Sequence, residues 1–201
     1  MKKKIAVVGA GGHGRVCAEI AKANGYEEVI FIDDADIPGV TVSGRVCDLG
    51  CRTREYDVFV AVGNNKTRKA LLDYAEGLGA NIATLIHPSA VVSPSASIGR
   101  GSVICPGAVV MTGAVLGEGV IVNTGASVDH DSKIGDTVHI AVGARVAGTV
   151  TVGDGVFIGA GAVVVNNLSV CADCTIGAGA AVVRDVKESG TYVGVPAKKI
   201  K

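Results

Sequence analysis

The chain has 201 residues, and its 19 Lys plus Arg balance its 19 Asp plus Glu, so the formal net charge is zero. This balance provides no strongly basic surface for nucleic acid or for an anionic membrane. Mean hydropathy is positive, at +0.44, but the uncharged stretch 101–117 is rich in Gly and repeats every six residues, unlike a membrane-spanning helix. We therefore expect neither a nucleic-acid partner nor membrane insertion.

The first segment has the pattern of a strand, a glycine turn and a helix. Residues 5–8 are a short buried-strand pattern that leads into a Gly-rich turn at 9–14, and residues 15–24 carry apolar residues at helical spacing. Gly9, Gly11 and Gly14 fit G-x-G-x-x-G, in which backbone N–H groups at a helix N-terminus bind phosphate oxygens. The same pattern is also compatible with a tight turn that binds nothing.

Two more strand patterns follow in this part of the chain. Residues 29–32 end on Asp33 and Asp34, where carboxylates would hold a ribose hydroxyl. Residues 58–62 end on Gly63, and a helix is expected from Lys66 to about residue 78. About 80 residues form only one mononucleotide-sized half of a doubly wound sheet, which is too little for both ends of NAD. A single nucleoside diphosphate attached to another group fits this domain better.

From Ile86 to Lys187 the sequence repeats every six residues. Each repeat begins with Ile, Val or Leu, the residue four positions later is small or modestly apolar, and Gly is frequent between them. A period of six fits neither a helix nor an isolated strand, and hexads of this kind predict a parallel β-helix with three hexads per coil. The 102 residues would make about 5.7 coils, which rise about 4.8 Å each. We predict a Rossmann-like α/β domain at 1–82 and a β-helix with a C-terminal cap at 83–201.

The candidate catalytic residue is His130, which lies between Asp129 and Asp131 and outside the inward apolar positions. Either carboxylate could bond one ring nitrogen, fix the tautomer and raise the basicity of the other nitrogen. One coil, or three hexads, further on is Gly148, which would stack over His130 without a side chain to block approach. A turn glycine with no other role is the alternative for that position.

Metal sites receive little support from the sequence. The positions of His87, His130 and His139 differ by 43 and by 9, which are not multiples of 18, so these residues cannot stack on one face as a three-His zinc site. Cys171 and Cys174 have the spacing of half a zinc site, but Cys174 falls on the small inward position of its hexad, so we expect structural thiols there. The chain opens with a short strand pattern and not a long apolar segment, so we expect a cytoplasmic protein with six reduced thiols.

Several motifs together carry a resemblance that covers the whole chain. They are Gly-Ala-Gly-Gly-His-Gly at 9–14, Phe-Ile-Asp-Asp at 31–34, Ala-Val-Gly-Asn-Asn-Lys at 61–66 with Arg68, Leu-Ile-His-Pro at 85–88, Val-Asp-His-Asp at 128–131, Val-His-Ile-Ala-Val-Gly-Ala at 138–144 and Val-Gly-Val-Pro-Ala-Lys at 193–198. This set resembles the bacterial sugar O- and N-acetyltransferases of the left-handed β-helix superfamily. It is most similar to the UDP-4-amino-sugar N-acetyltransferases, and the sialic acid O-acetyltransferases are relatives.

The resemblance implies the fold, the substrates and a role for each matching residue. The fold is a left-handed parallel β-helix, acetyl-CoA is the co-substrate, and a UDP-linked amino sugar is the acceptor. His130 matches the general base, and Asp131 stands where the N-acetyltransferases usually carry Glu, so Asp129 could share the orienting role. The remaining matches are Gly11, Gly12 and His13 for the diphosphate, Asp33 and Asp34 for the nucleoside, Gly63 and Lys66 for further substrate contacts, and His139, Ala160 and Ala178 for acetyl-CoA.

These residues predict direct acetyl transfer without a metal. Because Cys105 is the only thiol in the middle of the repeats and has no His near it in sequence, a covalent intermediate is disfavoured. An O-acetyltransferase and a non-catalytic nucleotide-sugar-binding protein remain as alternatives. His130 and Ala160 are five hexads apart, which is not a multiple of three, so they should lie at different corners of the prism. This arithmetic predicts a homotrimer with active sites between subunits.

Overall fold

The computed structural model describes residues 3–201 and divides into two compact units, one ending at Pro88 and one comprising Ser89–Lys201. The division falls after the strand β4 (Leu85–Ile86), later than the boundary expected between residues 82 and 83. Hydrogen bonds hold β4 within the first unit. The side chain of Asn24 donates to Ile86 O (2.7 Å) and accepts from Ile86 N (3.1 Å).

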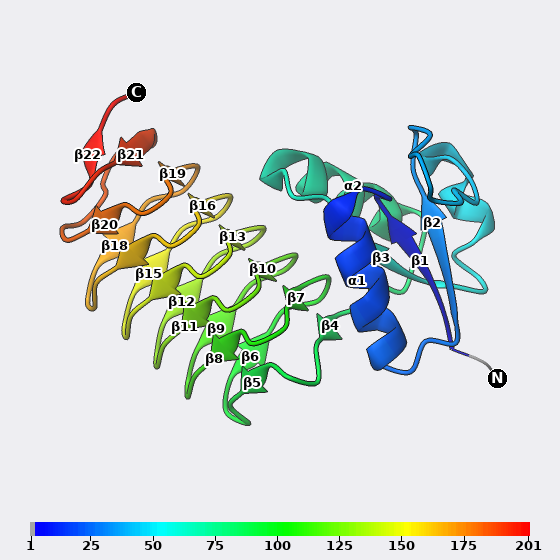
Figure 1. Ribbon diagram of the computed structural model, residues 1–201, viewed down its shortest axis with the longest axis horizontal. Helices are drawn as coiled ribbons and strands as arrows, with labels where there is room; N and C mark the ends of the chain where they lie inside the picture. Colours follow the sequence, from blue (N-terminus) through cyan, green and yellow to red (C-terminus); the bar gives the residue numbers. More distant parts are fainter. Residues whose placement is uncertain (1–2) are drawn as a thin grey trace. The chain divides into compact units, whose positions relative to one another are not determined.

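The first unit is a small parallel sheet with helices. Its strands β1 (Lys4–Val8), β2 (Glu28–Ile32) and β3 (Asp57–Val60) pair in the order β2-β1-β3. The helices α1 (Gly12–Ala23) and α2 (Asn65–Gly77) follow β1 and β3, and the 3-10 helix η1 (Val46–Cys51) lies between β2 and β3. In Figure 1 α1 lies in front of the sheet and α2 behind it. The Rossmann-like half that the sequence predicts is therefore confirmed.

Helix α1 begins earlier than the sequence pattern indicated. It starts at Gly12, not Arg15, because Gly11 is extended (φ −67°, ψ −168°) and acts as the N-cap. Gly12, His13 and Gly14 therefore form the first helical turn, and Gly11 provides no side chain to bond the free N–H groups of that turn. The N-terminal end of the helix thus presents backbone donors.

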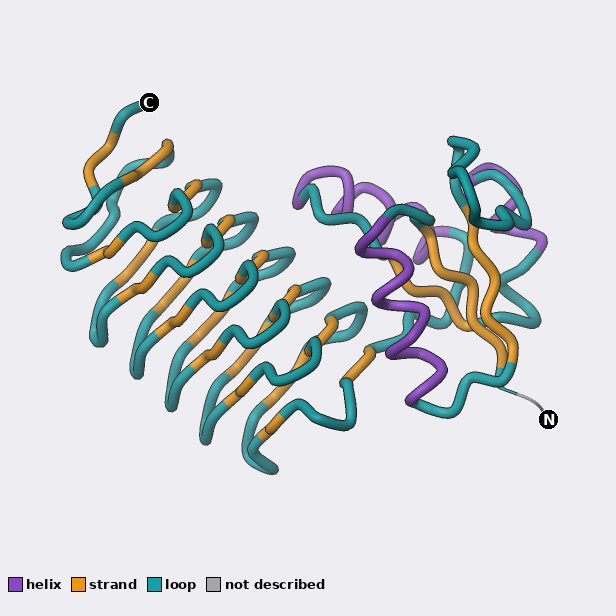
Figure 2. Tube along the Cα trace, in the orientation of Figure 1, coloured by secondary structure: helices purple, strands orange, loops and turns teal. Residues whose placement is uncertain are grey.

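The second unit is a stack of short parallel strands (Figure 2). Each of β5 to β20 has two residues, and the last pair, β21 and β22, is antiparallel. The strands are β5 (Val91–Val92), β6 (Ser97–Ile98), β7 (Val103–Ile104), β8 (Val109–Val110), β9 (Val115–Leu116), β10 (Ile121–Val122), β11 (Ser127–Val128), β12 (Lys133–Ile134), β13 (His139–Ile140), β14 (Arg145–Val146), β15 (Thr151–Val152), β16 (Phe157–Ile158), β17 (Val163–Val164), β18 (Ser169–Val170), β19 (Thr175–Ile176), β20 (Ala181–Val182), β21 (Thr191–Val193) and β22 (Lys198–Lys199).

The pairing confirms a β-helix with three hexads per coil. One face stacks β5-β8-β11-β14-β17-β20, the second stacks β6-β9-β12-β15-β18, and the third runs from β7 through β10, β13, β16 and β19 to β21. The register is constant, as in Val128↔Val146 and Val146↔Val164. The first residue of each hexad is buried from Ile104 to Val182, whereas Val92 and Ile98 are half-buried because they lie in the first coil and have core on one side only.

Candidate active site

His130 lies at the corner of the β-helix that follows β11, and its ring is held by the next residue. The Nδ1 atom is 3.0 Å from Oδ2 of Asp131. Asp131 occupies the left-handed turn position of its hexad, with φ 57°, a conformation that Asp tolerates better than most residues with a side chain. Asp129 has a different partner, because its Oδ1 accepts the backbone N–H of His130 at 2.7 Å. Asp131, not Asp129, therefore contacts the ring.

The two carboxylates make His130 more basic. The hydrogen bond to Asp131 raises the pKa of His130 above its usual value, and the charges of Asp129 and Asp131 add to that rise. Because both side chains of the pair are more than half exposed, solvent screens much of this interaction. When Nδ1 donates to Asp131, the other ring nitrogen, Nε2, is left as an acceptor for a proton.

Gly148 lies directly against the His130 ring. A Cβ atom at Gly148 would clash with Nε2 and lie 2.6 Å from Cε1, so only glycine leaves the ring where it stands. The backbone of the two coils is joined here as well, since Thr149 N–H donates to His130 O at 2.9 Å. Within residues 3–201, the Gly148 N–H has no protein acceptor.

Gly113 leaves space for the Asp131 side chain of the His130–Asp131 pair. This role of Gly113 was not predicted from the sequence. It lies one coil before Asp131, and a Cβ atom there would lie 2.5 Å from the Asp131 Oδ1. Subtracting 18 from 131 would have found this residue, in the same way that adding 18 to 130 found Gly148. The His130–Asp131 pair therefore stands between two glycines of its own corner.

The residues expected to contact acetyl-CoA lie on a different face and corner. Ala160 and Ala178 follow β16 and β19, which pair through Ile158↔Ile176, so these two exposed alanines are stacked one coil apart. Val142 precedes them by one coil, is 52% exposed, and extends the same apolar edge. His139 is half-buried on β13, with Nε2 3.2 Å from Asn123 Nδ2 and its ring edge-on to Phe157 at 5.1 Å.

Among the glycines of the turn at 9–14 in the first unit, only Gly11 and Gly12 have room for a side chain. A Cβ atom at Gly14 would collide with the carbonyl of Gly9, and one at Gly9 would lie 2.8 Å from Ala61 O. These two glycines thus allow close packing of strand and helix. Gly11 and Gly12, in contrast, have no heavy atom within 4 Å of an added Cβ. Their surface is open to a ligand, as the phosphate-binding interpretation requires.

Asp33 and Asp34 follow β2 and line a cavity of about 230 Å³, together with Gly9, Val46 and Leu71 among others. Backbone N–H groups already form hydrogen bonds to both carboxylates. Asp33 accepts the N–H groups of Ala10 (2.7 Å) and Ala35 (2.9 Å), and Asp34 accepts that of Val46 (2.9 Å). The sequence could not show these bonds. They fix both carboxylates at the mouth of a mainly apolar cavity, and a ribose would have to use their remaining lone pairs.

Arg68 organises the loop that follows β3. Its side chain is fully buried and donates to Val62 O (2.9 Å), Gly63 O (3.1 Å) and Asn65 Oδ1 (2.8 Å). Burial and the Arg68 charge lower the pKa of His13 to about 4, so this imidazole is neutral at pH 7. The predicted contact residues differ in exposure: Gly63 and His13 are half-buried, whereas Lys66 is exposed.

No metal centre was predicted, and in the described part of the chain no three His, Cys, Asp or Glu side chains lie close enough to hold an ion. Cys171 and Cys174 have their Sγ atoms 3.4 Å apart. Across residues 3–201, no helix has both the length and the apolar character needed to cross a bilayer.

Comparison with known proteins begins with the first unit. Residues 4–75 match the family model of the PglD N-terminal domain. Among solved structures, the acetyltransferase domain of PglB from Neisseria gonorrhoeae is 44% identical, with a TM-score of 0.95 over 99% of this chain and 100% of that chain. The chain belongs to the bacterial left-handed β-helix sugar acetyltransferase family. The resemblance found in the motifs and the expected left-handed β-helix are thereby confirmed.

Other members of the sugar acetyltransferase family extend the comparison. PerB from Caulobacter crescentus, solved in complex with CoA and GDP-perosamine, is 37% identical with a TM-score of 0.92, over 98% of this chain and 97% of that chain. The UDP-N-acetylbacillosamine N-acetyltransferase of Bacillus subtilis is 38% identical over 113 residues. That match spans about half the length of each protein, 51% in both cases.

Proposed function

We propose that this protein transfers the acetyl group of acetyl-CoA to the amino group of a UDP-linked 4-amino-sugar. The observation that carries the proposal is the His130–Asp131 pair, whose free Nε2 faces the bare backbone of Gly148. A general base that accepts a proton from an attacking amine needs this kind of oriented nitrogen. The names of PerB and of the Bacillus subtilis relative, both N-acetyltransferases of amino sugars, support the reaction class.

The proposed reaction is a direct transfer. The amine nitrogen attacks the thioester carbonyl carbon while Nε2 of His130 accepts the amine proton, and the carbon–sulfur bond breaks as the tetrahedral intermediate collapses. The imidazolium then protonates the departing CoA thiolate. In the intermediate, the Gly148 N–H is a suitable donor to the oxyanion, since it has no acceptor within residues 3–201.

Covalent catalysis by cysteine has no support in the β-helix core. Cys105 is fully buried, and burial raises the pKa of its thiol to about 12, so almost no thiolate is present at pH 7. A thiolate is the reactive form of cysteine. A ternary complex of protein, acetyl-CoA and amino sugar is therefore the proposed route.

The first unit is proposed to hold the nucleotide. Backbone donors at Gly11 and Gly12 would bind the diphosphate at the start of α1. The neutral, half-buried His13 would contribute a hydrogen bond without a charge. The cavity beside Asp33 and Asp34 would take the nucleoside. The named substrates of relatives include both UDP- and GDP-linked sugars, so the identity of the base is part of the test.

We further propose a homotrimer with shared active sites. His130 follows β11 in one sheet and Ala160 follows β16 in another, so they stand at different corners of one prism. A single acetyl-CoA molecule can therefore contact both His130 and the Ala160 edge only if these two come from different subunits. Mixing inactive His130→Ala chains with inactive Ala160→Trp chains should restore activity in mixed trimers. An active monomer in sedimentation, or no recovery on mixing, would contradict the shared site.

The function is tested by CoA release from acetyl-CoA in the presence of candidate acceptors. The panel contains UDP-4-amino-sugars, a GDP-4-amino-sugar, UDP-sugars without the amine, and free sialic acid. We expect release with a UDP-4-amino-sugar alone. Release with sialic acid would establish an O-acetyltransferase instead, and nucleotide-sugar binding without release from any acceptor would establish a non-catalytic binding protein.

A further inference from the structure

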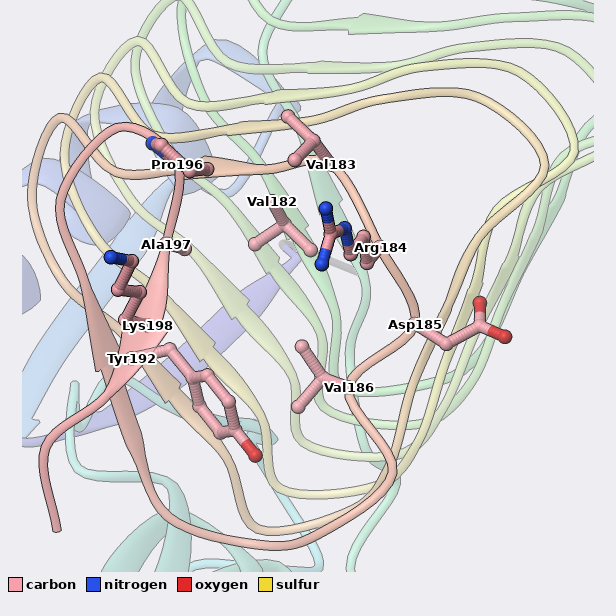
Figure 3. A pocket seen from close by; sticks show the side chains of 9 residues that line it. All are labelled: Val182, Val183, Arg184, Asp185, Val186, Tyr192, Pro196, Ala197 and Lys198. Atoms are coloured by element: carbon pink, nitrogen blue, oxygen red, sulfur yellow. The ribbon is translucent and has the colours of Figure 1, made fainter.

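The inside of the β-helix is lined mainly by apolar side chains. Figure 3 shows this near the C-terminal end, where Val182 and Val186 point to the inside of the coil and Asp185 points away from it. Two serines, Ser102 and Ser132, depart from this pattern and are nevertheless fully buried. Because a buried hydroxyl is costly unless it is hydrogen-bonded, the partners of these serines indicate their role.

The Ser132 hydroxyl bridges the two ends of the turn at 147–150, which belongs to the next coil. It donates to Ala147 O at 2.9 Å and accepts the Val150 N–H at 3.2 Å. Ser132 itself comes two residues after His130 in the sequence. The bridge therefore joins the coil of the proposed base to the coil that follows it.

A turn that follows an alanine by one coil closes without a bridge. In the turn at 123–126, which lies one coil after Ala108, the Ala126 N–H donates directly to Asn123 O at 3.0 Å. In the turn that Ser132 bridges, a hydroxyl oxygen stands between the two corresponding groups. The hydroxyl thus sets the shape of this turn, which would close directly if an alanine replaced the serine.

The bridged turn contains the proposed oxyanion donor. Ala147 O and the Gly148 N–H belong to one planar peptide group, so a hydrogen bond to that carbonyl also fixes the direction of the N–H. A bonded carbonyl polarises its amide, which makes the N–H a stronger donor. The bond from Ser132 therefore acts on the donor through a single peptide group.

The carbonyl of Gly148 is fixed as well. It accepts the Thr149 hydroxyl at 2.7 Å and the Asn167 N–H at 3.1 Å. The peptide groups on both sides of Gly148 are thus held by hydrogen bonds to their carbonyls, while the Gly148 N–H has no acceptor within residues 3–201. A donor held in place before the reaction is what stabilisation of an oxyanion requires. We propose that Ser132 is a positioning residue, which aims the Gly148 N–H at the oxyanion of the tetrahedral intermediate; this inference rests on the proposed function.

The test compares Ser132→Ala with Ser102→Ala, which loses the same pair of bonds at another corner. The Ser102 hydroxyl donates to Gly117 O at 3.1 Å and accepts the Val120 N–H at 3.0 Å, in a turn that follows β9. Because the lost bonds are alike, the two variants should have similar thermal midpoints. In steady-state assays with acetyl-CoA and a UDP-4-amino-sugar, we expect Ser132→Ala to lower kcat roughly tenfold or more with little change in either KM, as for a misplaced oxyanion donor. Ser102→Ala should keep the kcat of wild type.

A second variant and a pH profile separate positioning of the donor from other causes. Ser132→Cys keeps a weaker donor of similar size, so its kcat should lie between those of Ser132→Ala and wild type, and it carries the test if Ser132→Ala does not fold. The pH profile of kcat should keep its midpoint in Ser132→Ala, because the bond between His130 and Asp131 is not touched.

Three results would overturn the positioning role of Ser132. They are an equal loss of kcat in Ser132→Ala and Ser102→Ala, a wild-type kcat in the Ser132 variants, and a loss of kcat that comes with a shifted pH midpoint, which would place the effect at His130. If wild type releases no CoA with any acceptor, the proposed function itself fails.

Discussion

The two units build their candidate sites in different ways. On the β-helix, the His130 corner is exposed, and neighbouring coils contribute glycines, which leave space around the ring and the Asp131 carboxylate. In the first unit, the loops of the site are held by buried bonds, such as those from Arg68 to Val62, Gly63 and Asn65. Changes at the His130 corner should therefore affect chemistry more than stability. Changes at the glycine turn should affect nucleotide binding and leave the β-helix unchanged.

The largest expected effect is that of His130→Ala. It should lower kcat by a factor on the order of 10² to 10⁴, the range typical of a lost general base. The thermal midpoint should change little, because the side chain is 56% exposed. Affinity for the nucleotide sugar, measured by calorimetry, should also stay near that of wild type. Near-normal kcat in this variant would show that His130 is only a surface residue and would contradict the proposed mechanism.

Gly12→Leu tests the first unit in the same way. Its Cβ would meet no atom within 4 Å, so the fold can accept the change, but the side chain would fill the space in front of the helix N-terminus. We expect binding of the UDP-sugar to fall below detection while CoA binding persists. Gly77→Leu is the matched control, since it is also in an open position of the same unit, in α2. If Gly12→Leu still binds the UDP-sugar, the diphosphate does not bind at this turn. Tight binding of NAD would overturn the nucleotide-sugar assignment.

The same difference explains what could be predicted from the sequence. In the β-helix, one constant register of three hexads per coil fixes which side chains stack, so the neighbourhood of His130 and Gly148 follows from counting. Counting does not reveal side-chain bonds: Asp129 and Asp131 flank His130 equally in sequence, and only their different turn positions decide that Asp131 contacts the ring. The first unit has no repeat, so the hydrogen bond from the Ala10 N–H to Asp33, which joins residues 23 positions apart, depends on long-range folding and could not be predicted.

Gly148→Ala should have a smaller but clear effect on turnover. The added methyl group would overlap Nε2 of His130, and the exposed ring can move away more easily than the backbone. The ring would then lose its bond to Asp131, so kcat should fall roughly tenfold or more, as expected for a misplaced base. Ala172→Ser adds an atom at the same hexad position of another corner and should leave kcat unchanged. If Gly148→Ala instead lowers only the thermal midpoint, Gly148 serves the turn and not the site.

Asp131→Asn should have the smallest effect on rate and the most informative effect on pH dependence. Asn also tolerates the left-handed turn, so the backbone at φ 57° should persist. The Asp131 carboxylate raises the pKa of His130, and only the deprotonated imidazole can accept a proton. Activity should therefore rise with pH through this pKa, and removing the charge should move the rise to lower pH while kcat falls several-fold. Asp129→Asn keeps an oxygen for the His130 N–H and removes a charge but not the hydrogen bond to the ring, which is the largest cause of the raised pKa of His130, so it should shift the profile less. A larger shift in Asp129→Asn than in Asp131→Asn would assign the orienting role to Asp129, and an unchanged profile in both variants would mean that His130 does not carry the ionisation that limits the rate.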